Sequence, residues 1–199
     1  MVIKRIHQIW VGPNPIPEKS VRFMKQIKSL HPDYEYKLWT DSDLTHENFE
    51  TLNFINKSTI YAQKADIMRY EIMYRYGGIY LDIDFEVFKC LTPLLTNDLV
   101  ICSEDENIHR YMSNGFFYSI PGTATFRSCI DNLNTCNLNH PYIQYHTGPW
   151  YFKKNLKLNG ARIIPTNVMY PVHYLKKETI ADAKISSDTY ALHHWDKSY

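Results

Sequence analysis

The sequence of 199 residues predicts an α/β domain with a largely parallel central sheet. Strand-like apolar stretches alternate with amphipathic, helix-like stretches through the first half of the chain, which is typical of this class. The longest helical stretch ends at a Gly-Gly pair, and an apolar strand follows at once. No internal repeat or linker interrupts this order, so we expect one domain over residues 1–199, either alone or within a longer protein.

Each element of the first half has its own local signal. Apolar residues recur along 2–11 up to a Gly-Pro pair, which predicts the first strand. An amphipathic pattern predicts a helix over 17–30, and alternation predicts a second strand over 34–39. Capping residues at 40–43 predict a short helix. The longest helix is expected over 58–76, with one buried stripe at helical spacing that comprises Tyr61, Ala65, Met68 and Ile72.

The second half is less regular, and turn residues bound its elements. Apolar runs predict strands at 79–84, 99–103, 113–119, 162–164 and 190–194. Helical spacing of apolar residues predicts helices at 123–136 and 150–158.

Composition and charge exclude several classes of protein. Hydrophobic residues make up 44% and charged residues 22% of the chain, which is typical of globular domains and excludes a disordered chain. The formal net charge of +1 gives no long-range attraction for nucleic acid, so we expect no nucleic-acid partner. No apolar run approaches the roughly 20 residues that cross a bilayer. The four cysteines lack metal-site spacing, which predicts reduced thiols and a cytoplasmic location.

Two aspartates make the strand at 79–84 the most informative segment. Side chains alternate along a strand, so its three isoleucine and leucine residues are expected on the core face and Tyr80, Asp82 and Asp84 on the other. Carboxylates two residues apart, roughly 6 to 7 Å between Cα atoms, repel each other unless a cation neutralises them. A divalent cation carrying a diphosphate would supply that charge at the carboxyl end of the strand, where open α/β sheets bind ligands.

Other acidic residues have competing interpretations. Asp41 and Asp43 share the Asp-x-Asp spacing, but their cap-rich context predicts a helix cap or a solvated turn. Asp66 and Arg69 lie on one helix face and predict either a surface ion pair or a pair that holds a sugar hydroxyl and a phosphate. A glycosidase pair is a poor interpretation of the strand, because parallel side chains cannot flank a scissile bond.

Three segments together carry a resemblance to a known family. They are IHQIWVG at 6–12, the stretch from ADIMRYE to RYGGIYLDID at 65–84, and YALHHWDKSY at 190–199. In this order they resemble glycosyltransferase family 32, which includes capsular polysaccharide and mannosyltransferase-like enzymes and is similar in core to the clostridial glucosylating toxins. The resemblance implies a GT-A fold, a nucleotide-sugar donor and Mn²⁺, with Mg²⁺ as the alternative metal. Tyr199 departs from the tryptophan usual in the family.

The resemblance also implies residue roles. Asp84 would bind the metal directly, and Asp82 would reach it through water while contacting ribose or sugar. His193 is the expected third ligand, since a core position for Leu192 would turn His193 toward the cleft by strand alternation. The residues expected at the donor nucleotide sugar are Ile9, Trp10, Asp66, Arg69, Tyr80, Asp82, Lys197 and Ser198. Catalysis is expected from Asp82, Asp84, Arg69 and Asp105, and the family places acceptor- and sugar-facing groups near Glu104, Asp105 and Asn114.

These observations predict a metal-dependent glycosyltransferase that uses a UDP-sugar, with a GDP-sugar as the alternative. The acceptor would be a hydroxyl of a glycan, polysaccharide or glycoprotein. The metal, Arg69 and Lys197 would neutralise the departing diphosphate. Two rival functions stay open: a metal-dependent phosphoesterase or nuclease that uses Asp82 and Asp84, and a carbohydrate-binding module that uses the tyrosines. A bacterial cytoplasmic enzyme, or one encoded by a virus that acts in the host cytoplasm, is expected.

Overall fold

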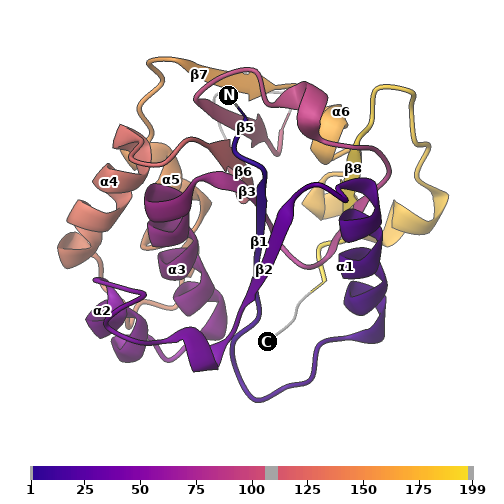
Figure 1. The fold of residues 1–199 in the computed structure, drawn as a ribbon. Helices are drawn as coiled ribbons and strands as arrows, with labels where there is room; N and C mark the ends of the chain where they lie inside the picture. Colours follow the sequence, from indigo (N-terminus) through magenta and orange to yellow (C-terminus); the bar gives the residue numbers. More distant parts are fainter. Residues whose placement is uncertain (1, 106–111, 197–199) are drawn as a thin grey trace.

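A six-stranded sheet forms the centre of the computed structural model, which describes residues 2–105 and 112–196 (Figure 1). Its strands are β1 (Arg5–Ile9), β2 (Glu35–Trp39), β3 (Gly78–Leu81), β5 (Leu99–Ser103), β6 (Met112–Ser119) and β7 (Ala161–Ile164). Their order is β2-β1-β3-β6-β5-β7. The pairings β1–β2, β1–β3 and β5–β7 are parallel, whereas β6 runs antiparallel to β3 and β5. The predicted α/β class with a mostly parallel sheet is therefore confirmed.

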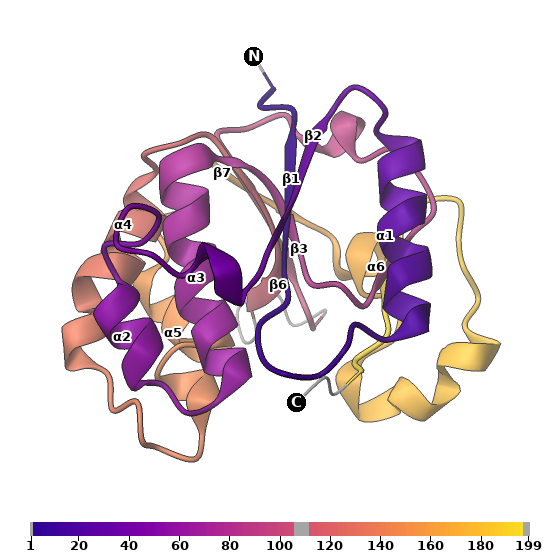
Figure 2. The ribbon, with the colours of Figure 1, turned by 60° about the horizontal axis from the view of Figure 1, so that its bottom comes forward.

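Helices cover both faces of this sheet (Figure 2). One face packs against α2 (Leu52–Lys57), α3 (Tyr61–Tyr76), α4 (Ala124–Asp131) and α5 (Pro149–Asn155). The other packs against α1 (Glu18–Leu30) and α6 (Thr166–Met169). A second, two-stranded antiparallel sheet of β4 (Phe85–Val87) and β8 (Ala191–His193) lies on the α1 side. The short 3-10 helices are η1 (Asp41–Asp43), η2 (Thr92–Leu94), η3 (Asn132–Thr135), η4 (Ile143–Tyr145) and η5 (Tyr174–Asp182).

The central strands are buried on both faces. Tyr80 of β3 and Phe117 of β6 pack toward α3, while Ile79, Leu81 and Phe116 pack toward α1. Strands buried in this way read as continuous apolar runs, which explains why the sequence located them. The face of β3 that carries Tyr80 is thus part of a second core.

The longest helix differs from its expected pattern. It begins at Tyr61, and its residues 66–73 are buried all round, because α3 lies between the sheet, α2 and α4. The expected single stripe is wrong: Met68 and Ile72 are buried, but Tyr61 and Ala65 are only half-buried. Those two side chains line the cleft described below.

Two glycines join this helix directly to β3. Gly77 has φ +60°, and a Cβ there would lie 2.7 Å from the carbonyl oxygen of Ser119. Gly78 has φ +93°, and a Cβ there would lie 2.7 Å from the carbonyl oxygen of Arg5. Only glycine fits both positions without strain. This tight turn between α3 and the start of β3 therefore fixes how the helix packs beside the strand.

Several boundaries also differ from the prediction. The expected strand at 79–84 stops at Leu81, because Asp82–Asp84 leave the sheet in a turn before the chain enters β4. The expected helix at 123–136 divides into α4 and η3. No helix within residues 2–105 and 112–196 is long and apolar enough to cross a membrane.

Candidate functional site

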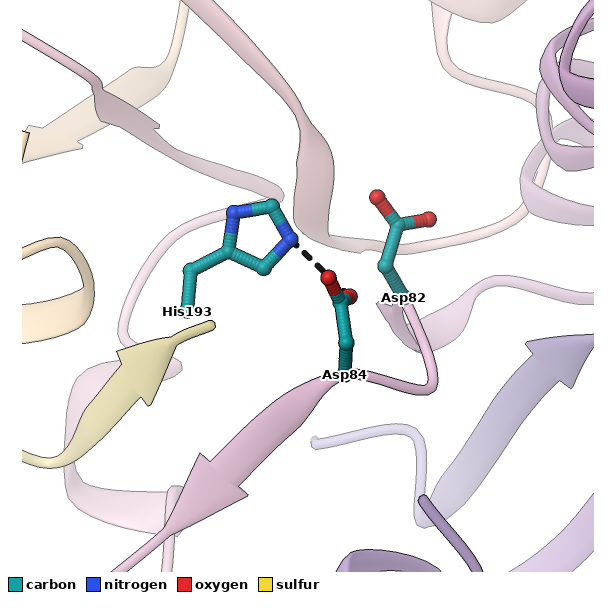
Figure 3. Close-up of side chains that lie close together, drawn as sticks. All are labelled: Asp82, Asp84 and His193. Atoms are coloured by element: carbon teal, nitrogen blue, oxygen red, sulfur yellow. Dashed lines mark hydrogen bonds and ion pairs between the residues drawn. The ribbon is translucent and has the colours of Figure 1, made fainter. Parts of the chain in front are cut away.

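The two aspartates lie in the turn at the carboxyl end of β3. The backbone N–H of Asp82 donates to the carbonyl of Gly115 at 3.0 Å, and its carbonyl accepts from the Gln8 side chain at 3.3 Å. The N–H of Phe85 donates to the carbonyl of Asp82 and closes the turn. This turn, rather than strand alternation, directs the carboxylates of Asp82 and Asp84 to the same side (Figure 3).

His193 completes a cluster of three metal-ligand groups. One ligand atom each from Asp82, Asp84 and His193 lie within 4.8 Å of one another. The Nε2 of His193 is 3.0 Å from Oδ1 of Asp84, and its buried Nδ1 has no hydrogen-bond partner among the described residues. Two carboxylates and an imidazole fit a divalent cation such as Mn²⁺ or Mg²⁺. The donor set therefore fits the metal that the sequence predicts.

Both faces of the strand that carries His193 are buried. Leu192 is a buried core residue, as the prediction assumed, but Ala191, which shares its strand face with His193, is buried too, so alternation alone does not decide where His193 points. His193 reaches the acidic turn because β8 pairs with β4, which places it opposite Phe85 with the two rings 4.5 Å apart.

Burial and charge set the ionisation of this cluster. Burial opposes the charge on Asp84, but His193 and the backbone N–H of Asp196 outweigh it and lower the pKa of Asp84. Burial likewise opposes protonation of His193, yet Asp84 raises its pKa. Burial raises the pKa of Asp82. The imidazole of His193 must be neutral to bind a metal, so cation binding here is coupled to proton release.

Arg69 brings a fixed positive charge from α3 to the acidic turn. One guanidinium nitrogen, Nη2, lies 3.2 Å from Oδ1 of Asp82 and 3.4 Å from Oδ1 of Asp66. The other, Nη1, donates to the carbonyl of Asn114, and the guanidinium lies 4.7 Å from the ring centre of Tyr80. The Tyr80 hydroxyl donates to Oδ1 of Asp82 at 2.6 Å. The carboxylate of Asp82 is thus held from two directions.

Asp66 lies behind this arrangement. Its carboxylate accepts hydrogen bonds from the Asn114 side chain at 2.7 Å and the Thr147 hydroxyl at 3.0 Å, and burial raises its pKa to about 6. The Asp66–Arg69 pair is buried, so the surface ion-pair interpretation is wrong. Asp66 does not line the cleft. The structure gives it a positioning role, and its contact with a donor sugar stays a prediction.

A cleft of about 660 Å³ opens in front of the acidic turn, within the size range of small-molecule sites. It brings together most of the predicted site residues, namely Ile9, Trp10, Arg69, Tyr80, Asp82, Asp84 and His193. The indole N–H of Trp10 donates to the carbonyl of Asn14 at 2.8 Å, which holds this ring at the wall. The roles of these residues toward a donor remain predictions.

Asp105 is not brought to the cleft. Its backbone N–H and carbonyl bond the Ser103 hydroxyl at 3.3 and 2.7 Å, while the neighbouring Glu104 lines the cleft instead. Burial raises the pKa of Glu104 to about 7, although a hydrogen bond from Ser113 opposes that shift. Lys197 and Ser198 lie outside the described residues, so their predicted phosphate contacts stay predictions.

Gly115 is a site residue that the sequence reasoning missed. It lines the cleft, and a Cβ there would lie 2.8 Å from Oδ2 of Asp82. The only feature that marks it in the sequence is that it is a glycine in a strand otherwise rich in aromatic residues. Three aromatic residues of the cleft wall, Tyr145, Trp150 and Tyr174, were also missed.

The site segment matches a known family model. Residues 17–101, which contain Arg69, Asp82 and Asp84, match the "Glycosyltransferase sugar-binding region containing DXD motif". This segment of the chain is therefore similar to the DXD-containing sugar-binding region of glycosyltransferases.

Curated relatives extend the match along the chain. Inositol phosphoceramide mannosyltransferase 3 of Schizosaccharomyces pombe is 32% identical over 96% of this chain and 59% of its own length. Mannosyl phosphorylinositol ceramide synthase CSH1 of Saccharomyces cerevisiae is 35% identical over 87% of this chain and 50% of its own. The chain thus spans between half and three fifths of these two relatives. An uncharacterized glycosyltransferase of Acanthamoeba polyphaga mimivirus, L373, is 26% identical over 96% of this chain and 83% of its own.

Solved structures agree on the fold. PaToxG glycosyltransferase superposes with a TM-score of 0.59 at 18% identity, over 78% of this chain and 68% of that chain. Galactosyltransferase LgtC, solved with donor and acceptor sugar analogs, superposes with a TM-score of 0.57 at 15% identity, over 98% of this chain and 88% of that chain. The GT-A fold implied by the resemblance is confirmed.

Proposed function

We propose that the chain transfers a sugar from a nucleoside diphosphate sugar to a hydroxyl group, with a divalent cation held by Asp82, Asp84 and His193. The observation that carries this proposal is the cluster of their ligand atoms within 4.8 Å, beside Arg69 in one cleft. A phosphoesterase could share the acidic pair, but the family match and the GT-A fold favour transfer of a sugar.

The residues of the chain divide the work at the departing diphosphate. Negative charge builds there in the transition state, and preorganised positive groups stabilise it most. Burial opposes the charge on Arg69, but Asp82, Tyr80 and Asp66 outweigh it and raise the pKa of Arg69, so its guanidinium stays charged. When bound, the cation would act as a Lewis acid on the same diphosphate. Trp10 would stack on the base, which orients the donor toward Arg69.

We propose Mn²⁺ as the metal and UDP as the nucleotide, with Mg²⁺ and GDP as the alternatives to be compared. Stacking on Trp10 does not distinguish bases, so the comparison needs measurement. Calorimetric titration of UDP and of GDP, with Mn²⁺ and with EDTA, tests the donor site directly. Binding that needs the metal and is lost in Asp84→Ala, but kept in the exposed control Asp188→Ala, supports the proposal. Failure of both nucleotides to bind with metal would overturn it.

The relatives favour a lipid-borne acceptor. Two of them are named for mannosyl transfer to inositol phosphoceramides. We therefore propose a headgroup hydroxyl of a lipid of this kind as acceptor, in place of the glycan, polysaccharide or glycoprotein that the sequence predicts. Transfer of labelled sugar to inositol phosphoceramide, compared with a soluble oligosaccharide, separates the two. Hydrolysis of a phosphodiester without any acceptor would support the phosphoesterase instead. A cytoplasmic location stays a proposal that cell fractionation tests.

A further inference from the structure

Large exposed apolar side chains gather at the mouth of the cleft. Tyr142 and Tyr145, at η4, are 59% and 55% exposed, and Tyr174 and Leu175, at the start of η5, are 42% and 75% exposed. These are four of the six large apolar residues that the described chain exposes. Tyr145 and Tyr174 also line the cleft, so the two exposed groups belong to one opening. Gathered apolar surface of this kind marks an interaction site.

Aromatic pairs hold both sides of this opening in place. On one side Tyr145 stacks on Trp150, with ring centres 5.8 Å apart and an interplanar angle of 19°. On the other, Tyr174 meets the edge of Trp195 at 5.7 Å. Figure 2 shows η5, in yellow, across the lower side of the molecule from the orange segment that leads into α5. These ring contacts therefore hold Tyr145 and Tyr174 in place at the opening.

Positive charge is concentrated in the same two segments. Residues 140–154 contain two lysines and no acidic residue, and residues 173–185 contain three lysines with one Glu and one Asp. Together they carry +3, whereas the whole chain carries +1, so the remainder is −2. The ammonium of Lys177 lies 5.2 Å from the Tyr174 ring, and that of Lys153 lies 5.4 Å from the Trp150 ring. Tyrosine and tryptophan beside lysine are the residues that proteins place at membrane interfaces.

We propose that this rim, defined as Tyr142, Tyr145, Tyr174, Leu175, Lys176 and Lys177, lies against the surface of an anionic lipid bilayer. The apolar side chains would enter the interface, and the lysines near it would be attracted to anionic lipid. The cleft would then open onto the headgroup layer. The inference rests on the proposed function in one respect: a headgroup acceptor could reach the acidic turn without leaving the bilayer.

Vesicle co-sedimentation of the full chain tests the rim. We expect binding to vesicles of phosphatidylcholine with phosphatidylserine, and weaker binding to phosphatidylcholine alone. The double variant Tyr142→Ser with Leu175→Ser removes two exposed side chains that do not line the cleft. Binding should fall by about tenfold or more, because burial of each large apolar side chain is favourable.

Leu158 provides a matched control at 58% exposure. It precedes β7, whose first residue Ala161 pairs with Leu99 at the start of β5, whereas Glu104 at the other end of β5 lines the cleft. Leu158 thus lies at the opposite edge of the sheet, and Leu158→Ser should bind vesicles as the wild type does. Equal loss in this control would overturn the assignment of binding to the rim.

Three further results would overturn the proposal. They are failure of the wild type to bind either vesicle, unchanged binding of the double variant, and lipid-free dimerisation that the double variant abolishes, since a second copy would then cover the rim. UDP titration on the same proteins separates this test from the proposed function. The double variant should bind UDP as the wild type does, so loss of nucleotide binding in all proteins with vesicle binding intact would overturn only the proposed function.

Discussion

The Nε2 of His193 lies 3.0 Å from Oδ1 of Asp84, and this contact joins segments 109 residues apart. Pairing of β8 with β4 brings them together, and the backbone N–H of Asp196 donates to Oδ2 of Asp84 at 3.0 Å from the same segment. The acidic turn therefore depends on the two-stranded sheet as well as on β3. A family match over residues 17–101 contains both aspartates but not the histidine.

Substitution of His193 tests whether the third ligand is real. We expect His193→Gln to weaken Mn²⁺ binding by at least the tenfold to hundredfold that loss of an outer-shell partner costs. Electron paramagnetic resonance of free Mn²⁺ gives the affinity without any need for turnover. His46→Gln, at an exposed position, is the control and should bind as the wild type does. Equal affinity in the two variants would remove His193 from the ligand set.

Gly115→Ala should displace the carboxylate of Asp82. The new Cβ would lie 2.8 Å from Oδ2 of Asp82 and 3.3 Å from the Tyr170 hydroxyl, so the carboxylate must shift. We expect Mn²⁺ affinity to fall about tenfold or more. The same titration gives the result.

Gly122→Ala is the informative comparison for this substitution. Gly122 has φ +76° and nothing within 4 Å of the added Cβ, so alanine there strains the backbone by about 1 to 2 kcal/mol without touching the site. It should lower the free energy of unfolding and keep the metal affinity. If both alanine variants bind Mn²⁺ alike, Gly115 does not shape the site.

Local pattern was enough to predict the six strands of the central sheet and the longer helices, but α2, α6 and β4 were not predicted, nor was the path of the acidic turn. The buried strands and α3 read as apolar runs or helical spacing. The end of β3 was missed, because pairing with β6 stops at Leu81 opposite Phe116, and strand alternation contains no signal for that. The prediction was also one position off after β5. Catalysis was expected from Asp105, but the neighbouring Glu104 lines the cleft.

Contacts between distant segments lay beyond the sequence reasoning. The spacing of Asp66 to Arg69, which is a local relationship, predicted either a surface ion pair or a pair that holds a sugar hydroxyl and a phosphate. The side chains that donate to Asp66 are those of Asn114 and Thr147, 48 and 81 residues away. Helical spacing shows that two side chains share a face, but whether that face meets solvent or another element is decided by packing.

Arg69→Met should destabilise the fold as well as the site. It would leave the buried carboxylates of Asp66 and Asp82 without their cation, and breaking a buried pair on one side costs about 3 to 5 kcal/mol. Urea unfolding gives the change in free energy. Arg127→Met is the matched control. The Arg127 side chain is 37% exposed, and its ion pairs with Glu50 and Asp131 should be worth under about 1 kcal/mol each. Similar losses in the two variants would contradict the buried network.

His7 should make the stability of the fold depend on pH, away from the acidic turn. Its Nδ1 accepts from the Trp39 indole N–H at 3.1 Å, and its Nε2–H donates to the carbonyl of Gly77 at 3.0 Å, which defines a neutral ring. Burial lowers the pKa of His7 to about 4, against 6.5 as its ordinary value. Between these values the unfolded chain binds the proton and the folded chain does not. Stability from this residue is therefore complete above pH 6.5 and falls as pH drops toward 4.

At pH 5 this difference amounts to about 2 kcal/mol relative to neutral pH. Urea unfolding at pH 7 and pH 5 measures it, and His7→Gln should remove that part of the pH dependence. His31, another buried histidine with a lowered pKa, is present in both proteins, so the difference between them isolates His7. Protonation would place a hydrogen on Nδ1 and break the bond from the Trp39 indole N–H, whereas the bond from Nε2–H to the carbonyl of Gly77 would remain. The same pH dependence in wild type and His7→Gln would show that this ring does not titrate with folding.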